Sequence, residues 1–278
     1  MNVPMKNSVN IWKPKGLGGV ECLRAEHVGV RFARHFHEGY AVGVIESGAL
    51  GFRYLGRDCV AAAGAVNMVV PGEVHDGHPA SPQGFAYRMF YLDAPVVERL
   101  AGELDGQGVK IPDFPGGVIQ DPQLASALRR LHLDLEAGST TLLERQSRLS
   151  TILSAWISRH AERKSRVRPA DEPRAVSRAR EYLRERASSP VSLEELSQAS
   201  GLSGFRLNRQ FSRFVGLAPH AYQVMLRVEA ARALIASGRS VSDAALESGF
   251  CDQSHLTRHF RRITGLTPGA YGKIVQDR

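Results

Sequence analysis

The stretch that decides the fold of the C-terminal part is GFCDQSHLTRHFRRITGLTPGAY, residues 249–271. Its second half has an earlier copy, because FSRFVGLAPHAY at 211–222 matches FRRITGLTPGAY at 260–271 with an offset of 49 residues. Further upstream the offset falls to 48, since residues 192–195 correspond to 240–243. Such a period indicates a duplicated supersecondary unit with one residue inserted in the turn of the second copy.

Each copy has the order of signals expected for a helix-turn-helix. These are a capping box, a glycine for the tight turn, an N-cap for the second helix and an i, i+4 apolar pair for its buried face. In the first copy they are Ser192 with Glu195, Gly201, Ser203, and Leu207 with Phe211. In the second copy they are Ser240 with Asp243, Gly249, Asp252, and Leu256 with Phe260.

The other face of each second helix is rich in Arg, Asn, Gln and Thr. These residue types read base edges in the major groove, whereas trailing arginines suit phosphates. A long helix expected over 219–237 joins the copies. A rigid connector of this kind can place two recognition helices about one DNA turn, ~34 Å, apart. The pattern therefore predicts sequence-specific binding to double-stranded DNA.

The charge distribution points the same way. The net charge is +8, and residues 173–278 hold 16 Arg or Lys against 9 Asp or Glu, whereas residues 1–160 hold 16 of each. A basic domain beside a neutral one indicates a polyanionic partner for the basic domain alone. Charge by itself is equally compatible with a solvated basic surface.

Several other classes of protein are disfavoured by the composition. We find no run of about 18 apolar residues that would span a membrane and no apolar core of a secretory signal. The three cysteines are widely spaced, which argues against a disulfide framework and a cysteine-ligated zinc site. The sequence also lacks a P-loop, a nucleophilic triad and a dinucleotide fingerprint. We therefore expect a cytoplasmic protein that is not an enzyme and has no membrane partner.

The pattern changes along the chain, which predicts an α+β fold with two domains. Residues 17–93 contain short apolar runs separated by Gly and Pro, typical of a small barrel or sandwich. Residues 94–160 have helical periodicity, residues 161–173 form a charged, proline-containing linker, and the chain beyond is helical. The expected strands include 41–45, 50–54, 65–70 and 85–92, and the expected helices 95–104, 121–137 and 140–162.

With these motifs, residues 174–273 resemble the DNA-binding domain of the AraC/XylS family, and residues 249–271 are close to the family signature. The helix-turn-helix units then span about 191–213 and 240–262. The resemblance implies base contacts from the two recognition helices, with Arg213 and Arg262 as phosphate contacts. The expected base-contacting residues are Phe205, Asn208, Arg209, Gln253, Ser254, His255, Thr257 and Arg258.

Two motifs in the N-terminal half, HFHEGY (35–40) and VPGEVHDGH (70–78), resemble those of cupins. Many AraC-type regulators are similar in carrying a cupin-like sensor barrel at this position. The resemblance implies a cupin-like β-barrel over residues 17–93 with flanking helices, and a small barrel can hold one small ligand. The polar residues expected to face such an effector are His35, His37, Tyr40, Glu73, His75 and Tyr87.

Metal-binding cupins use three histidines and a glutamate, and a set of three imidazoles suits a divalent transition metal. The glutamate is expected four or five residues after His37, where this sequence has Ala41 and Val42. Glu38 would point to the opposite face of a strand from its neighbour. We therefore expect no cofactor. The residues that would hold a metal, if any did, are His35, His37 and His75. Alternatively, these histidines form hydrogen bonds within the barrel or line a ligand pocket.

The function expected from these features is a transcription regulator, by family resemblance an activator that contacts RNA polymerase. A small-molecule effector in the barrel would act through the N-terminal arm (residues 1–16) and the linker. The helical segment 94–160 resembles a dimerising segment, so a homodimer is expected, although its apolar stripe would look the same packed on the barrel. Two alternatives stay open. One is a cupin-type metalloenzyme with an accessory DNA-binding tail, and the other is a non-specific architectural DNA-binding protein.

Overall fold

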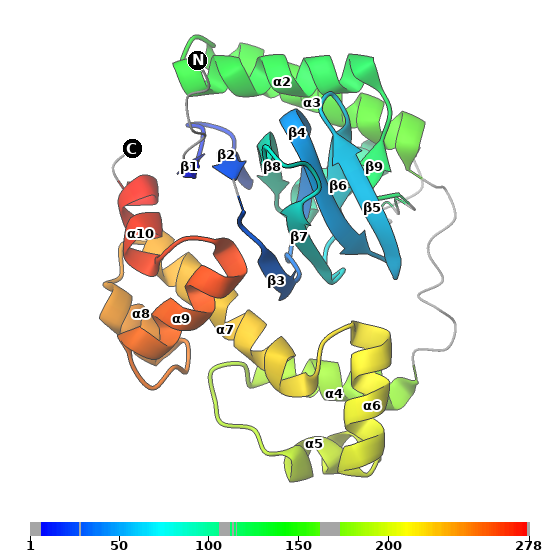
Figure 1. Ribbon diagram of the computed structural model, residues 1–278, viewed down its shortest axis with the longest axis vertical. Coiled ribbons are helices and arrows are strands. Elements are labelled where there is room, and N and C mark those ends of the chain that lie inside the picture. The colour runs from blue at the N-terminus through cyan, green and yellow to red at the C-terminus, as the bar shows by residue number, and fades with distance from the viewer. Residues whose placement is uncertain are drawn as a thin grey trace. The chain divides into compact units, whose positions relative to one another are not determined.

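The computed structural model describes residues 7–27, 29–105, 112, 114, 116–161 and 173–276 (Figure 1). The chain divides into two compact units, residues 1–31 with 36–166, and residues 167–278 with the short segment 32–35. Because segment 32–35 pairs with a strand of the sheet, we describe it with the N-terminal domain. Residues 1–6 of the expected arm and 162–172 of the expected linker lie outside the described residues.

Among the described residues, the N-terminal domain is built on a nine-stranded sheet, and the strands along its main path pair antiparallel. The hydrogen-bonded path runs β1-β2-β8-β4-β6-β9 and does not return to its first strand. The expected closed barrel is therefore replaced by an open sheet. The strands are β1 (Ser8–Trp12), β2 (Val20–His27), β3 (Phe32–His35), β4 (Tyr40–Tyr54), β5 (Arg57–Ala62), β6 (Val66–Val69), β7 (His75–Pro79), β8 (Phe85–Leu92) and β9 (Val118–Ile119).

Strand β4 is one long strand where the sequence predicts two. It runs for 15 residues through Gly48, which was expected to end a strand. Gly48 has φ of 68°, and the pairing of β4 with β8 shifts between Ile45 and Ser47. An irregularity of this kind bends a strand without ending it. As a result, the first half of β4 pairs with β6 and the second half pairs with β5 and β7.

Three helices of the N-terminal domain follow where helical periodicity predicts them: α1 (Ala94–Asp105), α2 (Pro122–Ala137) and α3 (Leu142–His160). Asp121 caps α2 by accepting a bond from the Leu124 N–H at 2.9 Å. Its other carboxylate oxygen binds Arg159 at 2.8 Å and His160 at 2.9 Å, at the end of α3. The Leu124 bond, followed by the His160 bond, lowers the pKa of the Asp121 carboxyl. One carboxylate thus joins the start of α2 to the end of α3.

The apolar stripe of α3 packs inside its own domain. Leu149, Leu153 and Ile157 are buried, and the Trp156 ring stacks on Phe114 with centroids 4.3 Å apart. The Trp156 ring also contacts Tyr40 of β4, with centroids 5.9 Å apart, so these residues pack within the domain, the arrangement given above as the alternative to a dimer interface. The exposed apolar residues of α3 are instead at its start, where Leu142 and Leu143 are 52% and 74% exposed.

A buried polar network joins β8 to α2. Arg88 Nη1 donates to Glu136 Oε2 at 2.5 Å and to His132 Nδ1 at 3.0 Å. His132 is fully buried, and its Nε2 donates to the Leu23 carbonyl at 3.2 Å. Because arginine only donates, Nδ1 must hold the lone pair and Nε2 the proton. Neutral His132 therefore fits both partners.

The C-terminal domain consists of helices in its described part, and the helices begin at the predicted N-cap residues, although Ser203 makes no side-chain cap bond. The Ser192–Glu195 capping box is complete: Glu195 N donates to Ser192 Oγ at 3.1 Å, and Ser192 N donates to Glu195 Oε2 at 2.6 Å. Leu207, Phe211, Leu256 and Phe260 are fully buried. The helices are α4 (Arg174–Glu185), α5 (Leu193–Ser200), α6 (Gly204–Val215), α7 (Pro219–Ala236), α8 (Val241–Glu247), α9 (Gln253–Thr264) and α10 (Pro268–Gln276).

Within the described ranges, no helix combines the length and apolar character needed to cross a membrane.

Candidate nucleic-acid interface and ligand site

The second recognition helix, α9, has a clearly divided surface. Its buried side consists of Leu256, Phe260 and Ile263. The opposite side, at i, i+4 and i+7, consists of the exposed residues Ser254, Arg258 and Arg261. Two of these three are among the expected base contacts. Arg261 is not, although its spacing from Arg258 and Ser254 places it on the same outward side.

Two other expected base contacts on α9 are engaged within their own domain. The His255 ring lies 5.2 Å from the Phe250 ring and 5.0 Å from the His259 ring, between centroids. Thr257 Oγ1 donates to the carbonyl of Gln253 one turn earlier, at 2.7 Å. Both side chains are half-buried and flank the outward side, whereas Gln253 is exposed at the start of the helix.

Arg262, the expected phosphate contact, is exposed and is oriented by a neighbour. Its Nη2 donates to His259 Nδ1 at 3.1 Å. Burial, followed by the charge of Arg262, lowers the pKa of His259 to about 4. His259 is therefore neutral near pH 7 and can accept this bond. The charge of Arg262 stays available for a phosphate.

The first recognition helix, α6, presents Asn208, Arg209 and Arg213 to solvent, as expected. The side chain of Phe205 lies outside the described part of the chain. The starts of the two recognition helices differ. Asp252 caps α9 by accepting from the His255 N–H at 2.7 Å, whereas Ser203 at the start of α6 makes no side-chain cap bond.

The charge on the two recognition helices is of one sign. Neither α6 nor α9 contains an acidic residue, and each contains three arginines. A surface of this kind attracts phosphates and releases their counterions on binding. The polar residues between the arginines can read base edges. The two helices thus have the chemistry of a DNA interface.

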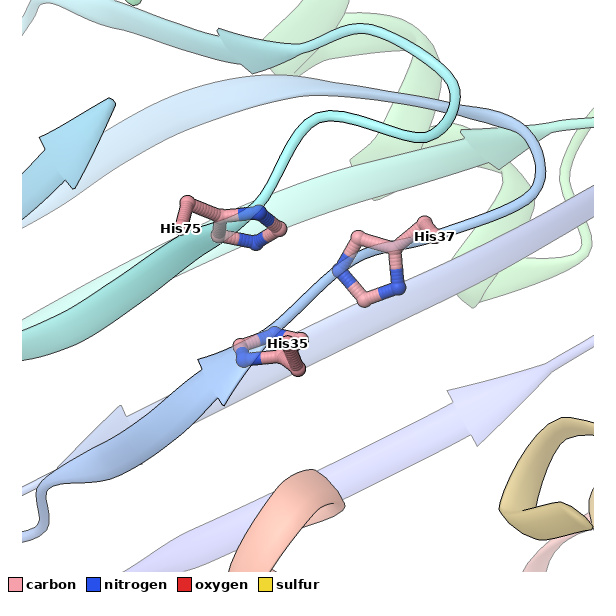
Figure 2. Close-up of side chains that lie close together, drawn as sticks. All are labelled: His35, His37 and His75. Atoms are coloured by element: carbon pink, nitrogen blue, oxygen red, sulfur yellow. The ribbon is translucent and has the colours of Figure 1, made fainter. Parts of the chain in front are cut away.

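The N-terminal domain contains a cluster of the three predicted histidines. His35 ends β3, His75 begins β7, and His37 lies in the segment that follows β3 (Figure 2). One ring nitrogen from each lies within 4.8 Å of the others. His35 and His75 are each 7% exposed, and the His37 and His75 rings have centroids 5.0 Å apart.

The hydrogen bonds of this cluster select the tautomer of two of its members. His35 Nδ1 lies 2.7 Å from the Ala33 carbonyl, and His75 Nδ1 lies 3.1 Å from the Glu73 carbonyl. A carbonyl oxygen only accepts, so both Nδ1 atoms carry a proton, and in the neutral rings the lone pair is therefore on Nε2. Backbone bonds of this kind orient metal-ligating histidines in proteins. The donor set therefore fits a divalent transition metal, and equally an organic ligand with N–H or O–H donors.

The position of the carboxylate that would complete a cupin metal site is occupied by Ala41, and an aromatic residue of the neighbouring strand lies beside it. Ala41, where a glutamate is expected, pairs with Tyr91 of β8. The Tyr91 ring stands edge-on to His37 with centroids 5.0 Å apart. Among the described residues, the metal-capable group contains these three histidines and no carboxylate, and Glu38 is exposed. Sequence reasoning missed Tyr91, which only the β4–β8 register brings to the cluster.

Two other residues expected to face an effector, Tyr40 and Tyr87, have their contacts elsewhere. Tyr40 is fully buried and pairs with Leu92, so it lies on the opposite face of the sheet from Tyr91. Its ring contacts Phe114 and Trp156, and its hydroxyl donates to the Pro112 carbonyl at 3.2 Å. Tyr40 is therefore a core residue under α3, because strand alternation turns it away from the histidines.

Tyr87 lies on the same face of β8 as Tyr91, but its hydroxyl is 3.5 Å from His27 Nε2 and its ring stacks on Phe85. Burial raises the pKa of Tyr87 well above its usual value. Glu73 contributes its backbone carbonyl to His75, as described above. The cluster that the structure assembles is thus His35, His37 and His75 with Tyr91 beside them.

Comparison with known proteins agrees with both domains. Residues 17–153 match the family described as AraC-like ligand binding domain, and residues 196–274 match the family described as helix-turn-helix domain. The chain is 28% identical over 243 residues to an uncharacterised HTH-type transcriptional regulator, YbfI of Bacillus subtilis, covering 85% of this chain and 86% of YbfI. It is 35% identical over 103 residues to the HTH-type transcriptional regulator RipA of Corynebacterium glutamicum, covering 37% of this chain and 31% of RipA.

Among solved structures, ToxT of Vibrio cholerae with a bound unsaturated fatty acid is similar in fold. The TM-score is 0.61 at 12% identity, and the match covers 100% of this chain and 99% of ToxT. Both have a sheet-rich N-terminal part and a helical C-terminal part. From the two matched families, the relatives and the paired recognition helices, we conclude that the chain belongs to the AraC family of transcriptional regulators.

Proposed function

We propose that this regulator is an activator that reads two DNA half-sites and responds to a small effector bound beside the three-histidine cluster. The observation that carries the proposal is the pair of recognition helices, each with exposed arginines on its outward side. Two such helices in one domain suit two adjacent major-groove segments. By linkage, the effector can change the DNA affinity only as far as it binds the DNA-bound and DNA-free states of the protein with different affinities, a difference of typically ~1–3 kcal/mol.

The test is selection of bound duplexes from a random DNA library by the full-length chain at a defined salt concentration. We expect one motif of about 17–20 base pairs, roughly two helical turns. Enrichment without a shared motif would instead favour a non-specific architectural protein. Transcription by purified RNA polymerase from a promoter holding the motif should rise with the protein present, and a fall would identify a repressor.

Arg258→Ala is expected to weaken binding to the selected motif by ~1–3 kcal/mol and to relax specificity at one base pair. The reason is that Arg258 stands on the outward side of α9, away from the buried residues. The measurement is fluorescence anisotropy on the motif and on duplexes with each base pair changed.

Arg262→Ala is the matched control, because it removes the same charge from the same helix. It should weaken all duplexes alike and reduce the slope of log K against log salt by about one contact. Equal weakening of every duplex by Arg258→Ala would mean that Arg258 contacts phosphate only.

A second candidate for the effector is a divalent transition metal. The specific observation is the pair of Nδ1 bonds to backbone carbonyls, which leaves Nε2 of His35 and His75 as lone-pair donors. His37 would supply the third nitrogen. Water or an organic ligand would complete the coordination, since the position of the usual carboxylate is Ala41. An enzyme on this site is not favoured by any relative named above.

For the metal candidate, we expect the full-length chain to bind one Co²⁺ with visible d–d absorption. His37→Ala should weaken binding by more than the roughly 10–100-fold lost when an outer-shell partner is removed. His78→Ala is the control, since His78 lies on β7 outside the cluster. Equal Co²⁺ affinity of wild type, His37→Ala and His78→Ala would rule the metal out and leave an organic effector. Absence of d–d absorption at micromolar Co²⁺ would have the same meaning.

The proposal includes a homodimer, which would double the DNA contacts. Its support is the exposure of Leu142 and Leu143 at the start of α3, since large apolar side chains seldom stay exposed together without a partner. Sedimentation velocity of the full-length chain at micromolar concentration distinguishes the dimer from a monomer.

A further inference from the structure

The loop of residues 186–189, between α4 and α5, is held by two side chains of the connecting helix α7. Arg227 Nε donates to the Ala187 carbonyl and Arg227 Nη2 to the Ser189 carbonyl, both at 2.8 Å. Gln223 Nε2 donates to the same Ser189 carbonyl, also at 2.8 Å. Gln223 is only 5% exposed. Buried donors of this kind are costly to leave without acceptors, so α7 and the loop are tied together.

The same loop touches the turn of the second helix-turn-helix unit. Gly249, in that turn, has φ of 88°, and a Cβ atom added to it would overlap the carbonyl oxygen of Ser188. The two backbones are therefore in direct contact, with no room for a side chain between them. The loop thus lies between α7 and the turn that precedes α9.

On its other side the loop leads directly into the first unit. Ser192, three residues after Ser189, is the N-cap of α5, and α5 packs against α6. Any displacement of the loop would therefore be passed to the first recognition helix. One short segment is in contact with the connecting helix, the second unit and the start of the first.

Comparison of the two copies shows that this arrangement is not part of the repeated unit. Tyr222 and Tyr271 correspond at the offset of 49 and are both buried. One residue later, however, Gln223 corresponds to Gly272, and Arg227 corresponds to Gln276. The second copy thus has neither the glutamine nor the arginine at the corresponding positions. Gln223 and Arg227 serve the junction between the units rather than either unit alone.

We propose that Gln223 and Arg227 are positioning residues that fix the separation and rotation of α6 relative to α9, and so determine the half-site spacing that the protein accepts. The inference rests on the proposed two-half-site reading of DNA. One base pair advances the groove by about 3.4 Å and rotates it by about 35°. While Gln223 and Arg227 hold the 186–189 loop, α6 and α9 cannot shift to follow half-sites that are one base pair closer or farther apart. Without these bonds, the two helices can adjust to the altered spacing.

The experiment uses the motif selected by the full-length wild-type chain, together with duplexes that have one base pair inserted or deleted between the half-sites. For wild type we expect a loss of at least about tenfold in affinity per altered spacing, the scale of a mismatched base pair. Arg227→Met should bind the unaltered motif more weakly but lose less than about threefold on the altered spacings. Its specificity within each half-site should be unchanged. Simple loss of stability would weaken binding to all duplexes alike, so it would not relax the discrimination between spacings.

Two further variants keep the result decisive. Arg227→Lys retains the charge and one donor, so it should fold even where Arg227→Met does not, and should show intermediate discrimination between spacings. Arg239→Met removes an arginine that is paired with Glu247 instead of the loop, and should keep the wild-type discrimination.

The inference is overturned where Arg227→Lys and folded Arg227→Met both retain wild-type discrimination between spacings. Failure of the proposed function itself looks different, because wild type would then select no motif with two half-sites.

Discussion

Gly249→Ala is expected to destabilise the DNA-binding domain by about 2–6 kcal/mol, the sum of a strained backbone and an overpacked contact. It should also abolish operator binding at concentrations that saturate wild type. Gly249 has φ of 88°, where an L side chain is disfavoured, and its Cβ would overlap the Ser188 carbonyl. Because that carbonyl belongs to the 186–189 loop, relief of the overlap would move α9 relative to α6. The measurements are urea unfolding followed by circular dichroism and anisotropy on the selected motif.

Gly238→Ala is the matched control for this prediction. Gly238 lies in the same domain with φ of 95°, but nothing lies within 4 Å of its added Cβ. It should therefore show only the backbone cost, about 1–3 kcal/mol, and keep the spacing preference of wild type. If the two variants were equally destabilised and both bound the motif, the contact between Gly249 and Ser188 would have no energetic role.

The second large effect is a loss of stability of the ligand-binding domain in mild acid. Burial, followed by the charge of Arg88, lowers the pKa of His132 to about 4 from its ordinary 6.5. Below pH 6.5 the unfolded chain therefore takes up a proton that the folded chain refuses. Stability falls as the pH falls from 6.5 to 4, by up to about 3 kcal/mol for this histidine. His27 is also buried, and its pKa is lowered to about 4, so its protonation in the unfolded chain lowers the stability over the same pH range.

Urea unfolding at several pH values between 7 and 5 measures this effect above the range in which carboxylates titrate. Tryptophan fluorescence reports on the N-terminal domain alone, because both tryptophans of the chain, Trp12 and Trp156, lie in it. The Trp12 ring is 4.8 Å from His132 between centroids.

The matched variant is His132→Gln, whose amide can replace the acceptor for Arg88 and the donor to Leu23. It should roughly halve the dependence of stability on pH, leaving the contribution of His27, and an unchanged slope would show that His132 titrates normally.

The DNA-binding domain was largely predictable because its signals are local. The capping box at Ser192, the positive φ at Gly249 and the buried pair Leu256 and Phe260 each depend on residues within one or two helical turns. A helix brings such residues together whatever the rest of the chain does. The outward placement of Arg258 and Ser254 follows from the same period, and so does that of Arg261, which the family resemblance did not include.

The ligand-binding domain shows where this reasoning ends. The sequence predicts three converging histidines, and His35, His37 and His75 do converge. It also predicts Tyr40 beside them, whereas Tyr40 lies under α3 on the other face of the sheet. A strand alternates its side chains between two faces, so the period alone cannot say which face meets the ligand.

By itself, the sequence determined the family, the two recognition helices, the capped helix ends and the identity of the clustered histidines, all carried by short motifs. Only the tertiary structure decided that the sheet stays open, that Tyr91 joins the histidines, and that Gln223 and Arg227 hold the 186–189 loop. These contacts join residues 34 to 54 positions apart. Their partners are chosen by strand register and helix packing, which depend on the whole domain closing around a core.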